Sequence, residues 1–368
     1  MGLSLRPYPE EPSLRRFASL LLISTLSVAL LGLQATPTAA LPRGTHVQTY
    51  RGNLNFPVDM AWLPGSRRIF FTEKNSGRIR VMKGPRLLSK PCVNLDVDSS
   101  GESGALGIVL HPRFRDNHFL YVYWTKDSPR TNRVTRFKVE DNRCRNPKVI
   151  ISGIPSGGYH NGGQLEFVDG KLFISTGEAH DPGLAQNRNN RVGKVLRLNP
   201  DGSTPLSNPF SDPGDRNPVW SYGHRNPFGL THKPGSKKLY ETENGPECDD
   251  ELNKIVKGRN YGWGDGYQCG TRGVGPNPKG PLVRWSNIIV PTDPWWYVGR
   301  MGSLSGDLYV GGYGDGKLHR YDLNAKGTRV VDRRVVYEGA GILDVSKGPR
   351  GWLYFLTDHS IRRIVPNN

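Results

Sequence analysis

The sequence predicts an all-β protein that folds as a six-bladed β-propeller. About six copies of one pattern follow one another: an apolar strand, a turn containing Pro or Gly, a strand rich in aromatic residues, and a strand that ends in Arg. Glycines and aromatic residues are spread evenly, as many short strands joined by turns require. After residue 40, no stretch keeps the 3.6-residue period of an amphipathic helix.

The copies lie at unequal spacings, which disfavours a solenoid and favours a ring of small antiparallel sheets. They cover 60–82 and 108–139, begin at Leu165, Leu230 and Gly306, and end with 345–365. A further strand near 46–50 is expected to complete the last sheet and close the ring. A pair of β-sandwiches is the alternative architecture. In a propeller, long insertions between strands gather on one face and can carry function there.

Residues 1–40 have the pattern of a secretory signal peptide. Three arginines precede an apolar run over 17–33, and small residues follow up to Ala40. An uncleaved membrane anchor is the alternative. No other apolar stretch is long enough to span a membrane, so we expect no stable membrane insertion after cleavage. The prediction is a secreted or otherwise extracytoplasmic protein whose propeller domain occupies residues 41–368.

The four cysteines fit an exported protein with two disulfide bonds. Cys92, Cys144, Cys248 and Cys269 allow three pairings. We favour Cys92–Cys144 and Cys248–Cys269, because both join cysteines that are neighbours in the sequence. No C-x-x-C stretch occurs, which disfavours a zinc or redox motif.

The formal net charge of +17 suits an acidic cofactor, an anionic wall polymer or a nucleic acid as partner. The predicted export argues against nucleic acid. The lysines and arginines form no dense run, so most of this charge is expected to lie dispersed over a solvated surface.

The region 221–263 concentrates residues with unusual chemistry. Arg225 offers a rigid fork of donors and Asn226 an amide, a pair suited to a carboxylate or quinone oxygen. Gly245 and Pro246 leave backbone carbonyls uncovered beside carboxylates, and such hard oxygen ligands favour calcium. These residues therefore indicate a site for an anionic organic cofactor and a hard cation.

A second candidate lies in 159–165, which reads YHNGGQL. The two glycines after His160 allow close approach of the backbone and could hold the imidazole at the central opening of a propeller. An imidazole that titrates near neutral pH can accept a proton from a hydroxyl group. Taken alone, a histidine beside glycines is more often a turn residue.

Five motifs follow in a specific order: HNGG, GKVLRLNPDG, GHRNP, GP-x-x-x-DELN and GRNYGW. With them the chain resembles the soluble glucose/sorbosone dehydrogenase family, the soluble quinoprotein aldose sugar dehydrogenases. The resemblance extends from Phe56 to Val365 and implies a six-bladed propeller. It also implies an enzyme that uses pyrroloquinoline quinone (PQQ) and Ca²⁺ to oxidise the C1 hydroxyl of an aldose to a lactone. Its partners would be an aldose or oligosaccharide and an external electron acceptor.

The resemblance implies a role for each candidate residue. His160 would be the catalytic base that takes the proton of the anomeric hydroxyl. Arg225 and Asn226 would contact the quinone, and the guanidinium would stabilise charge on the quinone oxygens. The carbonyls of Gly245 and Pro246 would hold the active-site calcium.

Two further residues resemble the ligands of a second, structural calcium in some family members. Glu251 lies in DELN and Tyr261 in NYGW, at the ten-residue separation of that pattern. A plain surface carboxylate is the alternative for Glu251. Trp263, Trp295 and Trp296 are candidates either for a platform that stacks on sugar or quinone, or for core aromatics between blades.

The chain departs from the family in the last blade, where PQQ-using members have an R-x-R-D stretch. Here 341–344 reads GILD, so the aspartate is kept and both arginines are absent. The expected cofactor-binding lysine is matched only loosely by Lys317, and Gln164 replaces the arginine expected after HNGG. Losing two charge-assisted contacts of about 1.5–3 kcal/mol each would weaken cofactor binding by orders of magnitude.

These departures leave two other functions open. A calcium-stabilised propeller without redox chemistry could bind a carbohydrate or a protein partner. A lactone-hydrolysing propeller would need several carboxylates that converge at one mouth, and Glu178, Asp181 and Asp344 are the candidates.

Overall fold

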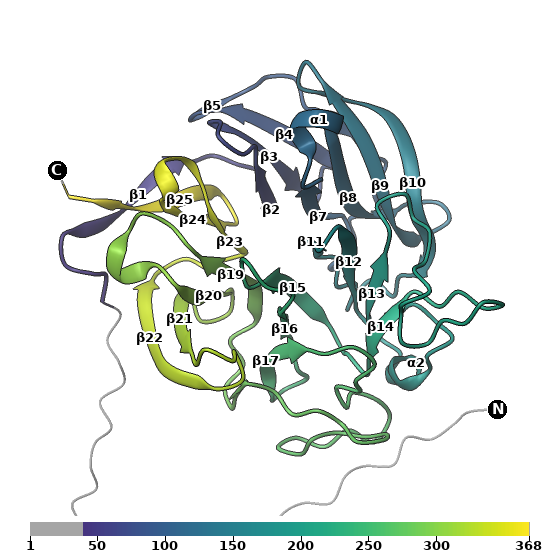
Figure 1. Cartoon of the computed structure of the whole chain (residues 1–368). Coiled ribbons are helices and arrows are strands. Elements are labelled where there is room, and N and C mark those ends of the chain that lie inside the picture. Colours follow the sequence, from purple (N-terminus) through teal and green to yellow (C-terminus); the bar gives the residue numbers. More distant parts are fainter. Residues whose placement is uncertain (1–39, 368) are drawn as a thin grey trace, which may run out of the picture. The chain divides into compact units, whose positions relative to one another are not determined.

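The computed structural model describes residues 40–367, and nearly all of their regular structure is β-strand (Figure 1). The predicted signal peptide therefore lies outside the described residues, apart from Ala40. Within the described range, no helix is long and apolar enough to cross a membrane.

Six antiparallel sheets follow one another around a common axis, which confirms the predicted six-bladed propeller (Figure 1). The first blade has β2 (Pro57–Trp62), β3 (Arg68–Glu73), β4 (Arg78–Lys83), β5 (Arg86–Leu87) and β6 (Val93–Asn94). The second has β7 (Ala105–Leu110), β8 (Phe119–Lys126), β9 (Thr131–Glu140) and β10 (Arg143–Pro155). The third has β11 (Leu165–Val168), β12 (Lys171–Thr176), β13 (Lys194–Leu198) and β14 (Val219–Tyr222).

The remaining blades have the same build. The fourth has β15 (Pro227–His232), β16 (Leu239–Glu243), β17 (Asp250–Ile255) and β18 (Val283–Trp285). The fifth has β19 (Pro291–Tyr297), β20 (Asp307–Gly312), β21 (Lys317–Leu323) and β22 (Val330–Glu338). The sixth has β23 (Asp344–Lys347), β24 (Leu353–Thr357), β25 (Ser360–Pro366) and β1 (Thr45–Arg51). Short helices α1 (Phe114–Asn117) and α2 (Pro182–Gln186) and 3₁₀ turns η1 (Gly302–Leu304) and η2 (Pro349–Gly351) lie between strands.

The strand β1 closes the ring, as the sequence predicted. It pairs antiparallel with β25, and His46 lies opposite Val365. The last blade therefore combines the two ends of the propeller, and Figure 1 shows these strands side by side. Because this pairing satisfies the backbone groups of the last strand, the ring has no open seam.

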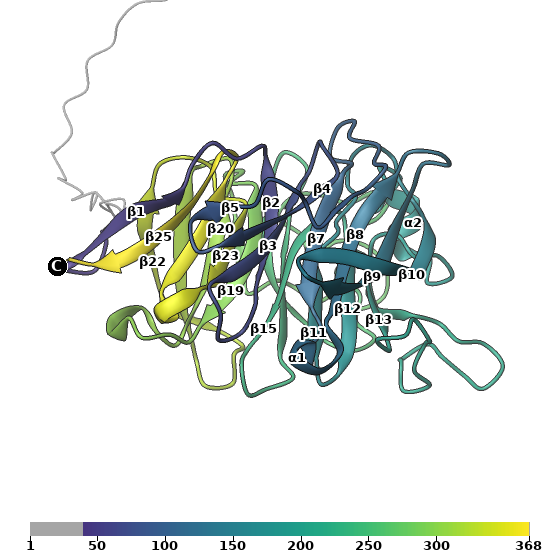
Figure 2. The ribbon, with the colours of Figure 1, turned by 90° about the horizontal axis from the view of Figure 1, so that it is seen from above.

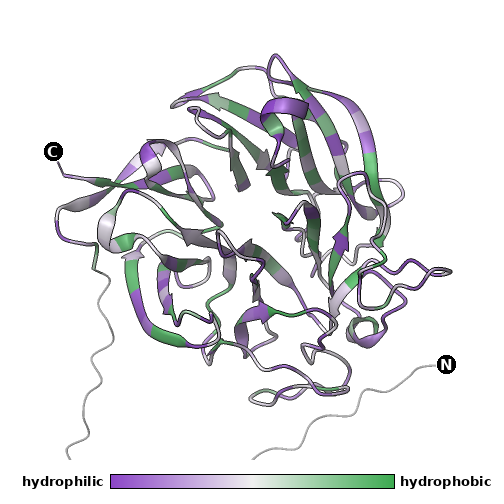
Figure 3. Cartoon of the chain, in the orientation of Figure 1, coloured by the Kyte–Doolittle hydropathy of each residue, from purple (hydrophilic) through white to green (hydrophobic). Residues whose placement is uncertain are grey.

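The second strands of the blades are buried on both faces, because each blade is covered by a neighbour on either side. Outer strands such as β10 and β22 carry many hydrophilic residues (Figure 3). In β3, for example, the consecutive residues Ile69, Phe70 and Phe71 are fully buried. Trp296 packs against Tyr240 between the fourth and fifth blades, so it is one of the core aromatics. Burying each large apolar side chain contributes about 1.5–3 kcal/mol.

Both predicted disulfide bonds are present. Cys92–Cys144 joins the segment before β6 to β10 and links the first two blades. Cys248–Cys269 joins the turn between β16 and β17 to the long connection between β17 and β18. No cysteine within the described residues is left free.

The antiparallel order fixes which loops share each end of the ring. The innermost strands β2, β7, β11, β15, β19 and β23 contact one another in a closed circle. One end of the ring, which we call the upper mouth, contains the segments just before the innermost strands and the turns between second and third strands. The turns between innermost and second strands lie at the other end, the lower mouth. Figure 2 shows the ring from its side, with loops at both ends.

Three buried aspartates on the innermost strands tie neighbouring blades together. Asp59 accepts hydrogen bonds from the backbone N–H groups of Met60 (2.7 Å) and Ile108 (2.6 Å). Asp344 accepts from the Met60 N–H at 2.9 Å. Asp293 of the fifth blade accepts from a backbone N–H of the fourth blade. Burial raises the pKa of Asp59 to about 7. Burial and the neighbouring carboxylates also raise the pKa of Asp293 and of Asp344.

We expect the free energy of unfolding to fall as the pH rises from about 5 to 8, because the folded protein holds protons on these carboxyl groups that the unfolded chain has released. Asp344→Asn keeps an oxygen for the Met60 N–H and needs no proton, so its stability should depend less on pH. The difference in free energy of unfolding between variant and wild type should therefore change in the variant's favour as the pH rises over this range. Urea unfolding of both proteins at several pH values in this range measures the difference. Parallel curves of unfolding free energy against pH for the two proteins would contradict the expectation.

Candidate active site at the upper mouth

His160 lies at the upper mouth, just before β11, and is held by two carboxylates. Its Nδ1 is 2.6 Å from Glu178 Oε1, and its backbone N–H donates to Glu102 Oε2 at 2.7 Å. The residue has φ +53°, and Gly177 leaves the space that this backbone needs, since a Cβ there would lie 1.9 Å from the His160 carbonyl oxygen. Because Nδ1 is bound to a carboxylate, Nε2 is the nitrogen left to face a substrate.

Asn226, just before the fourth blade, helps to hold the segment around His160 in place. Its Nδ2 donates to Glu102 Oε2 at 3.2 Å, and its Oδ1 accepts from the Gly162 N–H at 3.2 Å. One buried amide thus connects the loops that precede β7, β11 and β15. The contact of Asn226 with a quinone stays a prediction, but the structure shows a positioning role that the sequence did not indicate.

Arg225 lies in the same loop and is half-buried beside the His160–Glu178 pair. Its carbonyl accepts from the Glu178 N–H at 2.8 Å. Its Nη1 donates to two carbonyls of the turn after β16, one of them Gly245 O at 2.6 Å, and the guanidinium lies over the Trp263 ring at 5.3 Å. Burial lowers the pKa of Arg225 and the surrounding carboxylates raise it, so the side chain stays a cation.

The Gly245–Pro246 turn is shaped by Asp250. One oxygen of Asp250 accepts from the Gly245 N–H at 2.9 Å, and the other accepts from two N–H groups of the segment before β19 at 2.7 and 2.9 Å. Only glycine fits at 245, because a Cβ would lie 1.9 Å from the Cys248 carbonyl oxygen. Since Gly245 O already accepts from Arg225, a cation at the same oxygen would lie next to the charge of the guanidinium. The calcium site at these two carbonyls therefore stays a prediction.

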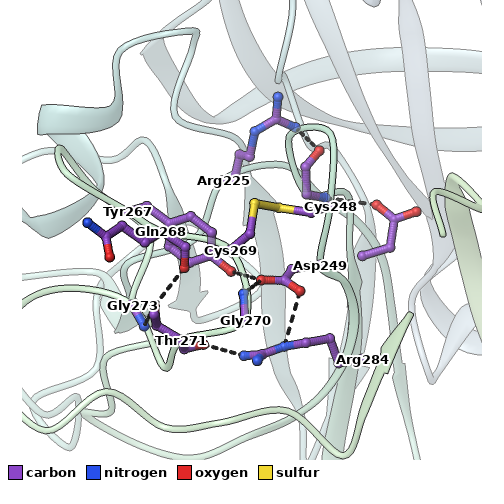
Figure 4. The surroundings of a disulfide bond; sticks show 12 residues. Arg225, Cys248, Asp249, Tyr267, Gln268, Cys269, Gly270, Thr271, Gly273 and Arg284 are labelled. Carbon is purple, nitrogen blue, oxygen red and sulfur yellow. Dashed lines mark hydrogen bonds and ion pairs between the residues drawn. A yellow bond between two sulfur atoms is a disulfide. The ribbon is translucent and has the colours of Figure 1, made fainter. Parts of the chain in front are cut away.

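A disulfide and an ion pair hold the loops next to this turn (Figure 4). Asp249, which follows Cys248, accepts from the Tyr267 hydroxyl at 2.8 Å and from the Gly270 N–H at 2.5 Å. Arg284 lies 3.6 Å from the other carboxylate oxygen. These contacts fix the connection between β17 and β18 against the turn that receives the Arg225 guanidinium.

A second acidic cluster lies inside the fourth blade, where Glu251 is the partner of Glu243 across β16 and β17. His224 Nδ1 lies 2.9 Å from Glu243 Oε2 and 4.0 Å from Glu241 Oε2. Both carboxylate oxygens of Glu241 and Oδ1 of Asn253 are buried without a hydrogen-bond partner among residues 40–367. Burial raises the pKa of Glu251 to about 8 and that of Glu241 well above its usual value. Unpaired buried oxygens of this kind fit a hard cation.

Tyr261 contacts this cluster through its ring and not through its hydroxyl. The ring stacks on His224 with centroids 4.6 Å apart. The hydroxyl donates to Lys254 O at 2.6 Å and accepts from a nearby backbone N–H at 2.9 Å. The phenol is therefore occupied by backbone, whereas ligand atoms of Glu241, Glu243 and His224 lie within 4.8 Å of one another.

The three residues considered for lactone hydrolysis do not gather their carboxylates at one point, although the Asp181 N–H donates to Glu178 O at 3.2 Å. Glu178 binds the His160 ring, Asp181 precedes α2, and Asp344 bonds the Met60 N–H inside the ring of innermost strands. The structure therefore gives no support to a hydrolytic cluster built from them.

The sequence indicated Glu178 only as a candidate for such a cluster, and it did not indicate Glu102 at all. Glu102 lies 58 positions before His160 and belongs to the preceding blade. No local motif surrounds either carboxylate, so a lone sequence carries no signal for their roles. The packing of neighbouring blades is what brings them to the imidazole.

Comparison with known proteins decides the family. The family model for glucose/sorbosone dehydrogenase matches residues 54–365. The chain belongs to this family. Aldose sugar dehydrogenase YliI of Escherichia coli is 30% identical over 358 residues, which cover 89% of this chain and 95% of that protein. Quinoprotein glucose dehydrogenase B of Acinetobacter calcoaceticus is 34% identical over 246 residues, which cover 57% of this chain and 50% of that protein.

A solved structure supports the same assignment. The PQQ-bound form of aldose sugar dehydrogenase from Streptomyces coelicolor superposes with a TM-score of 0.75 at 30% identity, covering 88% of this chain and 99% of that one. The predicted family and the predicted fold are thereby both confirmed.

This family member has no basic residue where the arginine pair of the last blade was expected. Gly341 and Leu343 stand at the two arginine positions, and Leu343 is 5% exposed and packs into the core. Gln164 is also buried, and its Oε1 accepts from the N–H of the next residue. Lys317 begins β21 and is half-buried. The residues at positions 341, 343 and 164 therefore do not supply the positive charge that the family pattern places there.

Proposed function

We propose that this chain is an extracytoplasmic, PQQ-dependent aldose sugar dehydrogenase that oxidises the C1 hydroxyl of an aldose to a lactone. One observation carries the proposal: Glu178 binds the His160 ring through its carboxylate and the Arg225 carbonyl through its N–H. A base and a guanidinium are thus positioned by one residue between the third and fourth blades. Both lie at the upper mouth.

Unpaired donors near His160 fit an acceptor-rich, planar cofactor. Among the residues that the structure describes, the buried Nε of Arg225, Nε1 of Trp263 and Nδ2 of Asn161 have no hydrogen-bond partner. Quinone and carboxylate oxygens accept from donors of this kind, and an indole ring offers a flat face. When bound, PQQ would supply the acceptor for the hydride that leaves C1 of the sugar.

The chain's own residues would handle the proton and the charge. His160 would take the proton of the anomeric hydroxyl at Nε2 while the C1–H bond breaks and the C1=O bond of the lactone forms. The carboxylate of Glu178 on Nδ1 would orient the ring and stabilise the imidazolium. Arg225 would stabilise negative charge that develops on oxygen beside it.

Reconstitution of the purified protein tests the proposal. On addition of PQQ and Ca²⁺, we expect a change in cofactor absorbance, a higher Tm, and dye reduction with aldoses that depends on PQQ. A panel of aldoses and of redox dyes would define the sugar and the type of external acceptor. No spectral change together with no shift in Tm would reject the proposal.

A non-catalytic propeller that binds a carbohydrate or a protein is the second candidate function. The observation in its favour is that Gly341 and the buried Leu343 stand at the positions of the expected arginines. This candidate predicts that PQQ changes neither the spectrum nor the Tm, whereas calcium still stabilises the fold. The same reconstitution therefore separates the two functions.

We further propose that Glu241 and Glu251 hold a structural Ca²⁺ in the fourth blade. Chelation should then lower the Tm by roughly 5 °C, and excess Ca²⁺ should restore it, since a ligand bound only to the folded state stabilises that state. Glu241→Gln should remove the effect of the chelator. Glu247→Gln, an exposed carboxylate in the neighbouring turn, is the matched control and should keep it. An unchanged wild-type transition in chelator would count against the metal.

A further inference from the structure

The lower mouth contains a large cavity that the proposed function does not use. It has a volume of about 1410 Å³ and is lined by the turns between innermost and second strands of several blades. None of His160, Glu178 and Arg225 lines it. The two mouths are separated by the buried aspartates Asp59 and Asp293, which line the inner end of the cavity.

The rim of this cavity is strongly basic. Arg67, Arg300, Lys347 and Arg350 are exposed at its edge, and Arg363 lines its wall. The turns that carry Arg300 and Arg350 touch, because the Arg300 N–H donates to Gly351 O at 3.2 Å.

These five cations have no acidic partner. None of them belongs to an ion pair among residues 40–367. Like charges gathered without a counter-charge repel one another, so an anion bound between them would be stabilised.

The acidic groups that line the cavity lie deeper and are already engaged. Asp59, Asp293 and Asp344 accept backbone N–H groups of neighbouring blades. Glu166 lies 3.2 Å from His232 Nδ1. The cavity therefore has a cationic rim and an inner end of hydrogen-bonding oxygens, which suits a ligand with one charged end and several hydroxyl groups.

Three polar atoms on the wall lack partners. Ser346 is 3% exposed, and its Oγ is buried without a hydrogen bond in the described part of the chain. The same holds for Nε1 of Trp62 and Nε1 of Trp295. All three residues line the cavity. Buried polar atoms are nearly always paired, so these atoms point to an absent ligand that accepts from the two indoles.

We propose that the lower-mouth cavity binds a polyhydroxylated anion, a sugar acid or a sugar phosphate. The rim arginines would pair with the carboxylate or phosphate, which they can contact through two N–H groups at once. The indoles would donate to oxygens and lie against C–H groups of the sugar, while the inner carboxyl groups would bond hydroxyls. A neutral sugar would leave the rim charge unpaired, and a bare anion would leave the indoles and the inner end unused.

Calorimetric titration of the full protein tests the proposal with four probes: gluconate, glucose 6-phosphate, glucose and inorganic phosphate. We expect gluconate or glucose 6-phosphate to bind at least about tenfold more tightly than glucose and than inorganic phosphate, because charged hydrogen bonds and the polyol contacts are both required. Raising the NaCl concentration should weaken this binding. Equal affinity for glucose, equal affinity for inorganic phosphate, or no binding of either anionic sugar would overturn the proposal.

Variants locate the binding at this mouth. Arg300→Gln with Arg350→Gln should weaken the binding of the anionic sugar by about tenfold or more. Arg145→Gln, at an exposed arginine on an outer strand, is the matched control and should leave the affinity unchanged. His160→Ala should also leave it unchanged, which separates this site from the upper mouth. An unaltered affinity in the folded double variant would overturn the assignment. If that variant does not fold, single Arg300→Gln and Arg350→Gln proteins provide the comparison.

Discussion

Replacing His160 with alanine is expected to lower kcat/KM for aldose oxidation by about 10²- to 10⁴-fold, the range over which a positioned base contributes to catalysis. His160 is 7% exposed, its Nδ1 is bound by Glu178, and it lies beside Arg225 at the upper mouth. The alanine variant should fold, because the backbone of His160 keeps its bond to Glu102. Steady-state dye reduction by the reconstituted enzyme measures the loss.

Two controls make this result specific. His46→Ala removes an exposed histidine of β1 and should leave the activity unchanged. Glu178→Gln keeps the shape of the side chain but loses its charge, so it should lower kcat more than it changes KM and should alter the pH profile of kcat. Full activity in His160→Ala would remove this residue from the mechanism and leave the fold assignment intact.

Removing the Cys92–Cys144 bond is expected to lower the free energy of unfolding by about 4 kcal/mol, since the bond closes a loop with a sequence separation of 52. It ties the first two blades together, and the Cys144 N–H also donates to Cys92 O at 3.0 Å. Urea unfolding of Cys92→Ser with Cys144→Ser, against the oxidised wild type, measures the loss. A change below about 1 kcal/mol would show that the unfolded chain is not restrained by this bond.

The other disulfide provides an informative contrast. Cys248–Cys269 spans only 21 residues, so its removal should cost less stability, about 3 kcal/mol. Its loss should reduce activity more, because it fixes the connection between β17 and β18 against the Gly245 turn that Arg225 contacts. Loss of Cys92–Cys144 should leave the kcat of the folded fraction unchanged.

The fold could be read from the sequence because its determinants are local and repeated. Each blade can be recognised from strands such as 68–73, in which the consecutive residues Ile69, Phe70 and Phe71 are apolar and a turn follows the strand. The closing strand at 46–50 and both disulfide pairs were predicted by the same kind of reasoning and are present. Strand periodicity and turn composition depend on neighbours in the chain, which a lone sequence contains.

The candidate site could be read only in part. Motifs located His160 and Arg225, but nothing near them in the chain indicates that Glu178 holds the imidazole or that Glu102 holds its backbone. The motif around Gly245 suggested a free carbonyl, whereas in the folded chain this carbonyl accepts a hydrogen bond from the guanidinium of Arg225. These outcomes depend on distances between blades, which sequence spacing does not encode.

The sequence by itself determined the architecture, the family and the cysteine pairs, and it predicted the residues that are proposed to bear chemistry at the upper mouth. Only the tertiary structure decided which atoms of those residues are free. It also placed Glu241 in the acidic cluster of the fourth blade with both oxygens unpaired, and it gathered Arg67, Arg300 and Arg350 around a cavity at the opposite mouth. The physical reason is that hydrogen bonds, burial and charge clustering arise between segments far apart in the chain, which become neighbours only when the ring closes.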